Sequence, residues 1–287
     1  MICLLIRQII PFFERISDWR ERVIDSHVHC FPPKLADRAL HGTLADRDFE
    51  VDGTLERQLV FAKKAGIRRF LLLNFASRPE NMAHVNEFAV ESNGKDGLVI
   101  SFGSVHPFAP DALQELDRLY ERGIRGIKFQ PIRQSFSMDD PRCRPVFARI
   151  GELGMMTVIH GGRSARTREY PVLPEHVAKY IDCFQGNSVV LSHMGGMFLT
   201  RKEIDAAAAL PVITDTAYSA YHMDLDAFAY AFERFGVERV MFGTDMPWAD
   251  LTKEKAYVDS LRLSPDDRER VYDGNAEHYL SQCGAWL

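Results

Sequence analysis

Short apolar runs alternate along the chain with segments whose apolar residues recur at helical spacing. The apolar runs cover 23–28, 67–75, 98–105, 124–130, 155–160, 188–193, 211–216 and 238–244. The helical segments cover about 54–65, 80–93, 111–122, 143–153, 174–183, 200–208, 224–235, 251–262 and 267–280. Strands that alternate with helices are typical of parallel strands joined by crossover helices. Eight such units in a chain of 287 residues predict a closed (β/α)8 barrel, the TIM-barrel fold.

Glycines at the ends of the helical segments support this prediction. The sequences KKAGI, ERGI, GELGM and ERFGV each place a glycine between a helix and the next strand. Glycine is common there because it adopts the left-handed backbone conformation without strain. The main loops, 30–52, 131–142 and 161–173, all follow strands. In a barrel such loops surround the active site, so we expect one catalytic domain over 23–287 with these loops at its mouth.

The chain before the barrel begins with the apolar run ICLLIRQIIPFF at 2–13. A membrane-spanning helix needs about 20 apolar residues, and this run is shorter and is interrupted by Arg7, Gln8 and Pro11. It also lacks the charged start and the small-residue cleavage site of a signal peptide. We therefore expect residues 1–22 to be an extension or a short helix, with no membrane partner.

Composition narrows the classes of function. The chain is 46% hydrophobic and 26% charged, with a net charge of −5. A nucleic-acid-binding domain would normally be basic, so we expect a small-molecule partner and no nucleic acid. The five cysteines are scattered and form no CxxC pair. This pattern argues against a disulfide framework and fits a reducing, cytoplasmic location.

Polar residues stand at the ends of four predicted strands, where apolar side chains would otherwise continue. His27 and His29 end the first strand, and alternate residues of a strand face the same side. Two imidazoles that converge in this way suit a divalent ion such as zinc. An isolated HxH pair would more often be structural, but its place at the end of the first barrel strand favours metal binding.

The other strand ends carry two histidines and an aspartate. His160 and His193 end the fifth and sixth strands, and two glycines follow each, which lets a loop or a ligand approach closely. Asp245 follows the eighth strand and precedes Pro247. A structural capping role is the alternative for each residue. Asp245 could bind a metal and could also accept a proton from a metal-activated water.

These segments resemble those of the amidohydrolase superfamily and, more narrowly, of the amidohydrolase-2 family. The matching sequences are IDSHVHCFP, GSVHP, GIKFQP, VIHGG, LSHMGG, FGTDMPW and GNA, and they span residues 24–276. HxH alone is a weak motif, whereas the ordered series over strands 1, 5, 6 and 8 is strong. The family includes aminocarboxymuconate-semialdehyde decarboxylase and γ-resorcylate decarboxylase. Members often dimerise, so the resemblance also allows a homodimer.

The resemblance implies a role for each of these positions. His27, His29, His160 and Asp245 match the metal ligands, with zinc the favoured ion. His193 matches a residue that orients or deprotonates the nucleophilic water in mononuclear members and is a ligand in binuclear ones. We expect one metal ion, and a second stays open. The sequence departs from the family at GIKFQP, where Gln130 replaces a histidine; Lys128 shares its strand face.

The expected activity is hydrolysis of an amide, ester or lactone by a metal-activated water, with Asp245 or His193 accepting the proton. The alternative is a lyase, a decarboxylase or hydratase of an unsaturated or aromatic acid. Arg163 is the first candidate to bind a substrate carboxylate, with Arg133 as another, and Lys128, Gln130 and Trp248 are further candidates for substrate contact. A barrel without catalysis is a third alternative, which five polar groups at strand ends disfavour.

Overall fold

The structure, a computed structural model, describes residues 22–42, 49–167 and 169–285. The expected extension over 1–22 lies almost wholly outside the described residues and stays a prediction. No helix in the described ranges is long and apolar enough to cross a membrane.

Eight parallel strands form the centre of the molecule. They are β1 (Val23–Val28), β2 (Ile67–Leu73), β3 (Val99–Phe102), β4 (Gly126–Phe129), β5 (Met156–Ile159), β6 (Val189–Leu191), β7 (Thr214–Asp215) and β8 (Val240–Met241). Hydrogen bonds order them as β1-β2-β3, β4-β5-β6 and β7-β8. Single parallel bridges, Gly103 to Ile127, Val190 to Ile213 and Val28 to Met246, join the three sheets into a ring. The predicted TIM barrel is confirmed.

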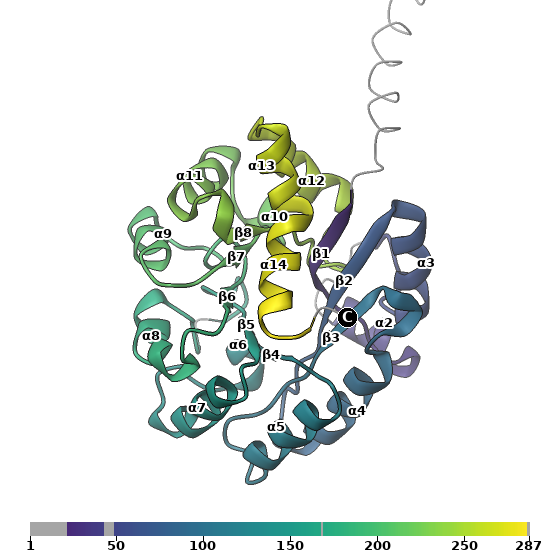
Figure 1. Cartoon of the computed structure of the whole chain (residues 1–287), viewed down its shortest axis with the longest axis vertical. Coiled ribbons are helices and arrows are strands. Elements are labelled where there is room, and N and C mark those ends of the chain that lie inside the picture. Colours follow the sequence, from purple (N-terminus) through teal and green to yellow (C-terminus); the bar gives the residue numbers. More distant parts are fainter. Residues whose placement is uncertain (1–21, 43–48, 168, 286–287) are drawn as a thin grey trace, which may run out of the picture.

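Helices surround this ring (Figure 1). They are α2 (Pro33–His41), α3 (Leu55–Ala65), α4 (Met82–Ser92), α5 (Ala112–Glu121), α6 (Pro131–Gln134), α7 (Arg144–Glu152), α8 (Pro174–Ala178), α9 (Arg201–Ala208), α10 (Ser219–His222), α11 (Leu225–Phe235), α12 (Leu251–Ser260), α13 (Pro265–Glu269) and α14 (Asn275–Gln282). Short 3-10 helices are η1 (Pro79–Asn81), η2 (Lys95–Gly97), η3 (Pro141–Cys143), η4 (Ile181–Phe184) and η5 (Val237–Arg239), and η6 (Arg270–Gly274) is a π-helix.

The elements follow the predicted order, with differences in detail. The expected helix over 174–183 is divided into α8 and η4, and the last one is α13, η6 and α14 in direct succession. The segment 30–52 was predicted as a long loop, and the structure shows that it contains α2. This helix starts on Pro33, a favourable first residue, and buries Ala36 and Leu40, which are four residues apart.

The predicted glycines behave as expected. Gly66, Gly123, Gly154 and Gly236 all have positive φ angles, between 68° and 85°. Each lets the chain leave a helix and turn directly into the next strand. Local sequence therefore sets the helix-to-strand turns on the amino-terminal side of the barrel.

The interior of the barrel is closed at one end by α14. Ile24, Met156 and Val190 point into the ring and form one buried cluster with Ala276 and Leu280 of α14. Figure 1 shows α14 lying across the centre of the ring of strands. Because Ile24 and Met156 stand at the starts of their strands, α14 covers the amino-terminal end. A larger apolar cluster lies between strands and outer helices.

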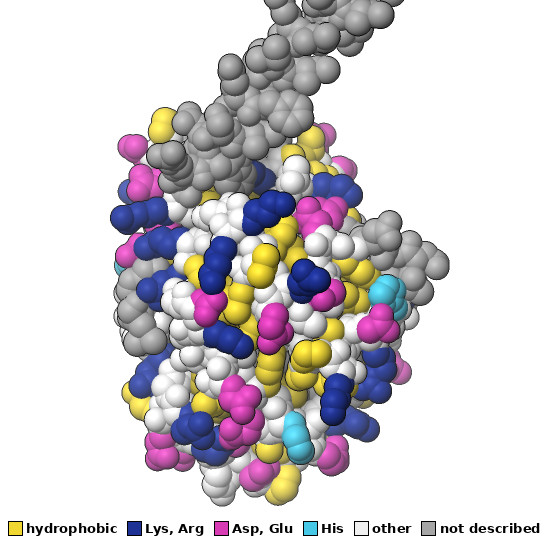
Figure 2. Space-filling view, turned by 90° about the vertical axis from the view of Figure 1, so that its right-hand side faces the viewer, with side chains coloured by type: hydrophobic (Ala, Val, Ile, Leu, Met, Phe, Trp, Pro, Cys, Tyr) yellow, Lys and Arg dark blue, Asp and Glu magenta, His cyan; other side chains and the backbone are white. Residues whose placement is uncertain are grey.

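Charged side chains of both signs are interspersed over the face shown in Figure 2, and the hydrophobic groups on it lie between them. Mixed charge of this kind agrees with the small net charge of −5. Burial of apolar surface stabilises the barrel. The polar residues at the ends of the strands lie at the opposite end of the barrel from α14.

Candidate metal centre

Two histidines and an aspartate meet where β1 and β8 end. Nε2 of His27 lies 3.4 Å from Oδ1 of Asp245, and Nε2 of His29 lies 3.3 Å from the same oxygen. One ligand atom from each of the three residues fits within 4.8 Å of the others. These three side chains therefore lie together at the mouth of the barrel, as the sequence predicted.

The end of β8 is tied to β1 by hydrogen bonds. The backbone amide of Asp245 donates to the carbonyl oxygen of His27 (2.8 Å). Asp25 accepts hydrogen bonds from the amide (2.9 Å) and the hydroxyl (2.7 Å) of Thr244. Asp245 has a φ angle of +71°, an uncommon conformation for a residue with a side chain. These contacts hold Asp245 over the imidazoles.

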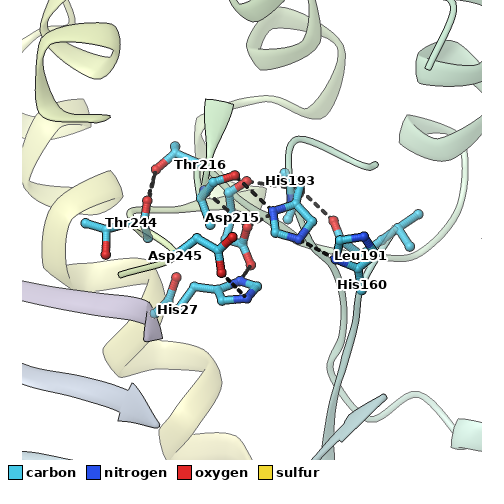
Figure 3. Close-up of polar contacts among 12 residues, drawn as sticks. His27, His160, Leu191, His193, Asp215, Thr216, Thr244 and Asp245 are labelled. Atoms are coloured by element: carbon cyan, nitrogen blue, oxygen red, sulfur yellow. Dashed lines mark hydrogen bonds and ion pairs between the residues drawn. The ribbon is translucent and has the colours of Figure 1, made fainter. Parts of the chain in front are cut away.

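His27 has a defined partner on each ring nitrogen. Its Nδ1 lies 2.9 Å from Oδ2 of Asp215, which ends β7 (Figure 3). Its Nε2 lies 3.2 Å from Nζ of Lys128 on β4. All three side chains are buried. Asp215 was not among the sequence-based candidates, although a carboxylate that ends an apolar run was a usable signal.

His160 and His193 form a separate contact at the ends of β5 and β6. Nε2 of His193 lies 2.8 Å from Nδ1 of His160 (Figure 3). Nδ1 of His193 lies 3.0 Å from the carbonyl oxygen of Ala217. A carbonyl only accepts, so Nδ1 of neutral His193 carries the proton and Nε2 accepts one from His160. His160 then keeps its lone pair on Nε2, the nitrogen that a metal could take.

The glycine pairs after these histidines pack against each other. A Cβ atom on Gly162 would lie 2.2 Å from the carbonyl oxygen of Met197, and one on Gly196 would lie 2.6 Å from the amide of Gly162. Side chains would therefore push the two loops apart. The sequence predicted that these glycines let a loop or a ligand come close. In the structure it is the neighbouring loop that packs against them.

The cluster has strongly perturbed acid–base properties. Burial lowers the pKa values of His27, His160 and His193, with a further lowering by other positive groups. Burial also lowers the pKa of Lys128 to about 8 and raises that of Asp245. Neutral imidazoles have the free electron pairs that a metal ligand needs.

The donor set fits a divalent cation. Imidazole nitrogens and a carboxylate oxygen are the ligands that zinc takes in proteins. Within the described ranges, the ligand atoms form two groups: His27, His29 and Asp245, and His27, His193 and Asp215. His160 belongs to neither group, and Nδ1 of His27 in the second group already has a carboxylate partner. The first group is therefore the candidate metal site.

A cavity of about 350 Å³ opens beside this site. It is lined by three residues of the cluster, by aromatic and apolar side chains, and by one arginine from each of the three main loop regions: His29, His160, Asp245, Phe31, Phe75, Ile132, Met197, Tyr218, Trp248, Gln130, Arg38, Arg133 and Arg166 among others. Nη1 of Arg166 donates to the carbonyl oxygen of Gly42 (2.9 Å), which joins the loop after β5 to the end of α2.

The predicted substrate-contact residues lie in different places. Gln130 and Trp248 line the cavity. Lys128 is completely buried beside His27 and is not a lining residue. Arg163 forms an ion pair with Glu203 (2.5 Å) and lies outside the lining of this cavity. Arg166 and Arg133 line it instead, and so does Arg38 of α2, which sequence reasoning missed because it treated 30–52 as an irregular loop.

The family model described as Amidohydrolase matches residues 24–280. The chain belongs to the amidohydrolase-2 family. The resemblance drawn from the strand-end motifs is thereby confirmed, and the chain is an amidohydrolase-2 family member with a candidate His/Asp metal site. No curated protein sequence matches it.

Solved structures of the same fold resemble this amidohydrolase. An uncharacterised TIM-barrel protein, Bb4693 of Bordetella bronchiseptica, is 20% identical, with a TM-score of 0.71 over 92% of this chain and 99% of the other. The 5-carboxyvanillate decarboxylase LigW of Sphingomonas paucimobilis is 15% identical (TM-score 0.66, 91% and 99%). An amidohydrolase of Burkholderia multivorans with bound zinc is 17% identical (TM-score 0.66, 91% and 99%). At these identities the similarity shows the fold.

Proposed function

We propose that this chain is a metal-dependent hydrolase that cleaves an ester, lactone or amide bond in a small substrate carrying a carboxylate. The proposal rests on one observation: the candidate metal site and the cavity share residues. The ligand atoms of His27, His29 and Asp245 gather within 4.8 Å, and His29 and Asp245 also line the arginine-containing cavity. A substrate in that cavity would therefore reach the metal site directly.

We propose His27, His29, His160 and Asp245 as the ligands of one divalent ion, zinc being favoured by the nitrogen-rich donor set. When bound, such an ion supplies Lewis-acid chemistry, polarising a carbonyl and lowering the pKa of a water molecule. His160→Ala is expected to lose metal and activity together. Retention of full metal content by this variant would remove His160 from the ligand set.

Asp245 is the residue we assign to proton transfer. Its carboxylate lines the cavity, with its side chain 13% exposed, and its Oδ1 lies within 3.4 Å of two imidazoles. From there it would accept a proton from the attacking water and return it to the leaving group. His193 is the alternative acceptor, but both of its ring nitrogens have partners within the protein. We expect His193→Ala to keep most metal and lose turnover.

The outer part of the cavity suits an anionic substrate. Arginine binds carboxylates through paired hydrogen bonds, and Arg38, Arg133 and Arg166 all line the cavity. Gln130 lines it too, and its Oε1 has no hydrogen-bond partner within the described part of the chain. This oxygen would accept a hydrogen bond from a substrate hydroxyl or amide. We assign carboxylate binding to Arg166 and Arg133 in preference to Arg163.

A lyase is the second candidate function, and the same arginines favour it because they select acids. Decarboxylation breaks the carbon–carboxylate bond, and the electron pair left on carbon takes up a proton, which Asp245 could supply. LigW, a decarboxylase by its description, shares the fold. Hydrolysis needs a water beside the metal and Asp245, whereas decarboxylation does not.

The test is a panel of lactones, acyl amides, esters and aromatic carboxylates offered to the zinc-loaded protein. Acid release without carbon dioxide supports hydrolysis. Carbon dioxide release from an aromatic or unsaturated acid would instead establish the lyase. With an active substrate, Arg166→Ala should raise KM by roughly 10- to 100-fold, the value of one charged hydrogen bond. Arg163→Ala should have a smaller effect, because its guanidinium is held by Glu203 outside the cavity.

A further inference from the structure

Asp215 uses both of its carboxylate oxygens inside the candidate metal centre. The residue ends β7 and is completely buried. Its Oδ2 lies 2.9 Å from Nδ1 of His27. Its Oδ1 accepts hydrogen bonds from the backbone amides of His193 (2.8 Å) and Ala217 (3.3 Å). Figure 3 shows Asp215 between the two histidines. A single side chain from β7 thus connects β1 with β6.

The contact with His27 fixes the position of its ring proton. A carboxylate only accepts hydrogen bonds, so Nδ1 of His27 carries a hydrogen. The partner of Nε2 is a donor. Nε2 lies 3.2 Å from the amino group of Lys128, and an ammonium only donates. The two neighbours therefore agree on the same tautomer. They leave the lone pair of His27 on Nε2, whose nearer neighbour is the amino group of Lys128 (3.2 Å) and not Oδ1 of Asp245 (3.4 Å).

The other carboxylate oxygen of Asp215, Oδ1, accepts a hydrogen bond from a strained turn. His193 and Met194 have φ angles of +66° and +52°, in the left-handed region that is unfavourable for residues with a side chain. The amide of His193 donates a hydrogen bond to Asp215. This hydrogen bond offsets part of that cost and fixes the backbone from which the His193 side chain extends. That ring in turn contacts Nδ1 of His160. The orientation of His160 thus depends on the same carboxylate.

We propose that Asp215 is a positioning residue that sets the tautomer of His27 and the turn at His193 together, and so aligns metal ligands from two sides of the barrel. The inference rests on the proposed function, because its main consequence is metal affinity. Partners that orient metal-binding histidines typically contribute about 10- to 100-fold to metal affinity.

Asp215→Asn separates the two contacts. The amide oxygen can still accept from His193 and Ala217, whereas the amide NH2 group can only donate to His27. The variant should therefore move the ring proton of His27 from Nδ1 to Nε2. We expect zinc affinity, measured by competition with a chelator, to fall roughly 10- to 100-fold. In the metal-free protein, nitrogen NMR of labelled histidine should report the change of tautomer, with the His27 signals identified from a His27→Gln spectrum.

Asp273→Asn is the matched control. Asp273 is also buried, but it pairs with Arg68 at the start of β2, at the other end of the barrel. Its replacement should lower thermal stability and leave zinc affinity unchanged. Unchanged zinc affinity in Asp215→Asn, or a wild-type His27 with its proton on Nε2, would overturn the inference.

The wild-type spectrum decides the tautomer even if Asp215→Asn does not fold. If wild-type protein binds no zinc, the proposed function fails, while the Nδ1 proton of His27 still tests the role of Asp215. The two failures are therefore distinguishable.

Discussion

The two ends of the barrel use buried residues in opposite ways. At the amino-terminal end, Ile24 and Met156 pack against Leu280 of α14 in a wholly apolar cluster. At the carboxyl end, Lys128 and Asp215 are just as completely buried, yet both are charged groups beside imidazoles. Burying charged groups costs free energy that their partners only partly offset, so the second arrangement contributes less to stability than the first.

Backbone conformation also differs between the two ends. His193, Tyr218 and Asp245 have positive φ angles at the mouth, where each is held by neighbouring hydrogen bonds. At the helix-to-strand turns of the other end, most positive φ angles are taken up without strain by glycines such as Gly66 and Gly154, with Asp96 and Gln185 as exceptions. The difference teaches that one end is built for stability and the other holds polar groups in fixed positions.

The largest expected effect is loss of function without loss of fold. His29→Ala removes a proposed ligand at the mouth. It should lower activity and zinc affinity by more than roughly 100-fold, the upper limit expected for a residue that only orients a metal ligand. The melting temperature of the metal-free protein should change little. Metal analysis and thermal melting on the same sample check this. A variant that keeps its zinc would contradict the assignment.

The converse experiment is Leu280→Ala, at the apolar end. Removing a completely buried leucine should cost about 2–5 kcal/mol of unfolding free energy. Zinc content and activity per folded molecule should be unchanged, because α14 lies at the opposite end from the metal centre. Urea unfolding gives the stability. Reduced zinc affinity in the folded variant would show that the two ends are coupled.

An intermediate effect is expected for Arg68→Gln. Arg68 forms ion pairs with Asp273 (2.6 Å) and Glu277 (2.8 Å) near the amino-terminal end. Its loss leaves the buried carboxylate of Asp273 without its cation and should cost about 1–3 kcal/mol. Comparison of melting curves with wild type measures the loss, and an equal effect in Asp273→Asn would support the pairing. No change in stability would remove these ion pairs from the account.

The smallest effect concerns Glu254, a buried carboxyl on α12 that accepts hydrogen bonds from the amide of Ala220 in α10. Burial raises its pKa from 4.5 to about 9. Between these values the folded protein keeps a proton that the unfolded chain has released, so stability falls as pH rises through this window. Glu254→Gln should remove that slope, so the variant should be more stable than wild type at pH 8.

Urea unfolding at pH 5 and pH 8 tests this prediction, because the variant should gain relative to wild type only at the higher pH. An equal pH dependence in both proteins would contradict it.

Much of the fold could be predicted because local sequence determines it. Apolar runs mark the strands, and glycines such as Gly123 and Gly154 mark the turns that feed them. The His27, His29 and Asp245 cluster could be predicted too, since parallel strands in a barrel end on one side. These features depend on short sequence windows and on a single topological rule.

The rest depends on contacts between distant segments. Asp215 acquires its role only when β7 lies near both His27 and His193, which no window around residue 215 contains. Arg163 and Arg166 look alike in sequence, but Glu203 holds the first outside the cavity. Arg38 was missed because α2 folds within a loop. Partners that are remote in the chain therefore decide which polar residues reach the cavity.

The central claim is that three imidazoles and one carboxylate share a single divalent ion at the mouth. A crystal structure of the zinc-loaded protein, with anomalous diffraction at the zinc edge, tests it most directly. The account predicts one peak, with nitrogens of His27, His29 and His160 and an oxygen of Asp245 at about 2.0–2.2 Å. A peak elsewhere, or none among these four side chains, would contradict it.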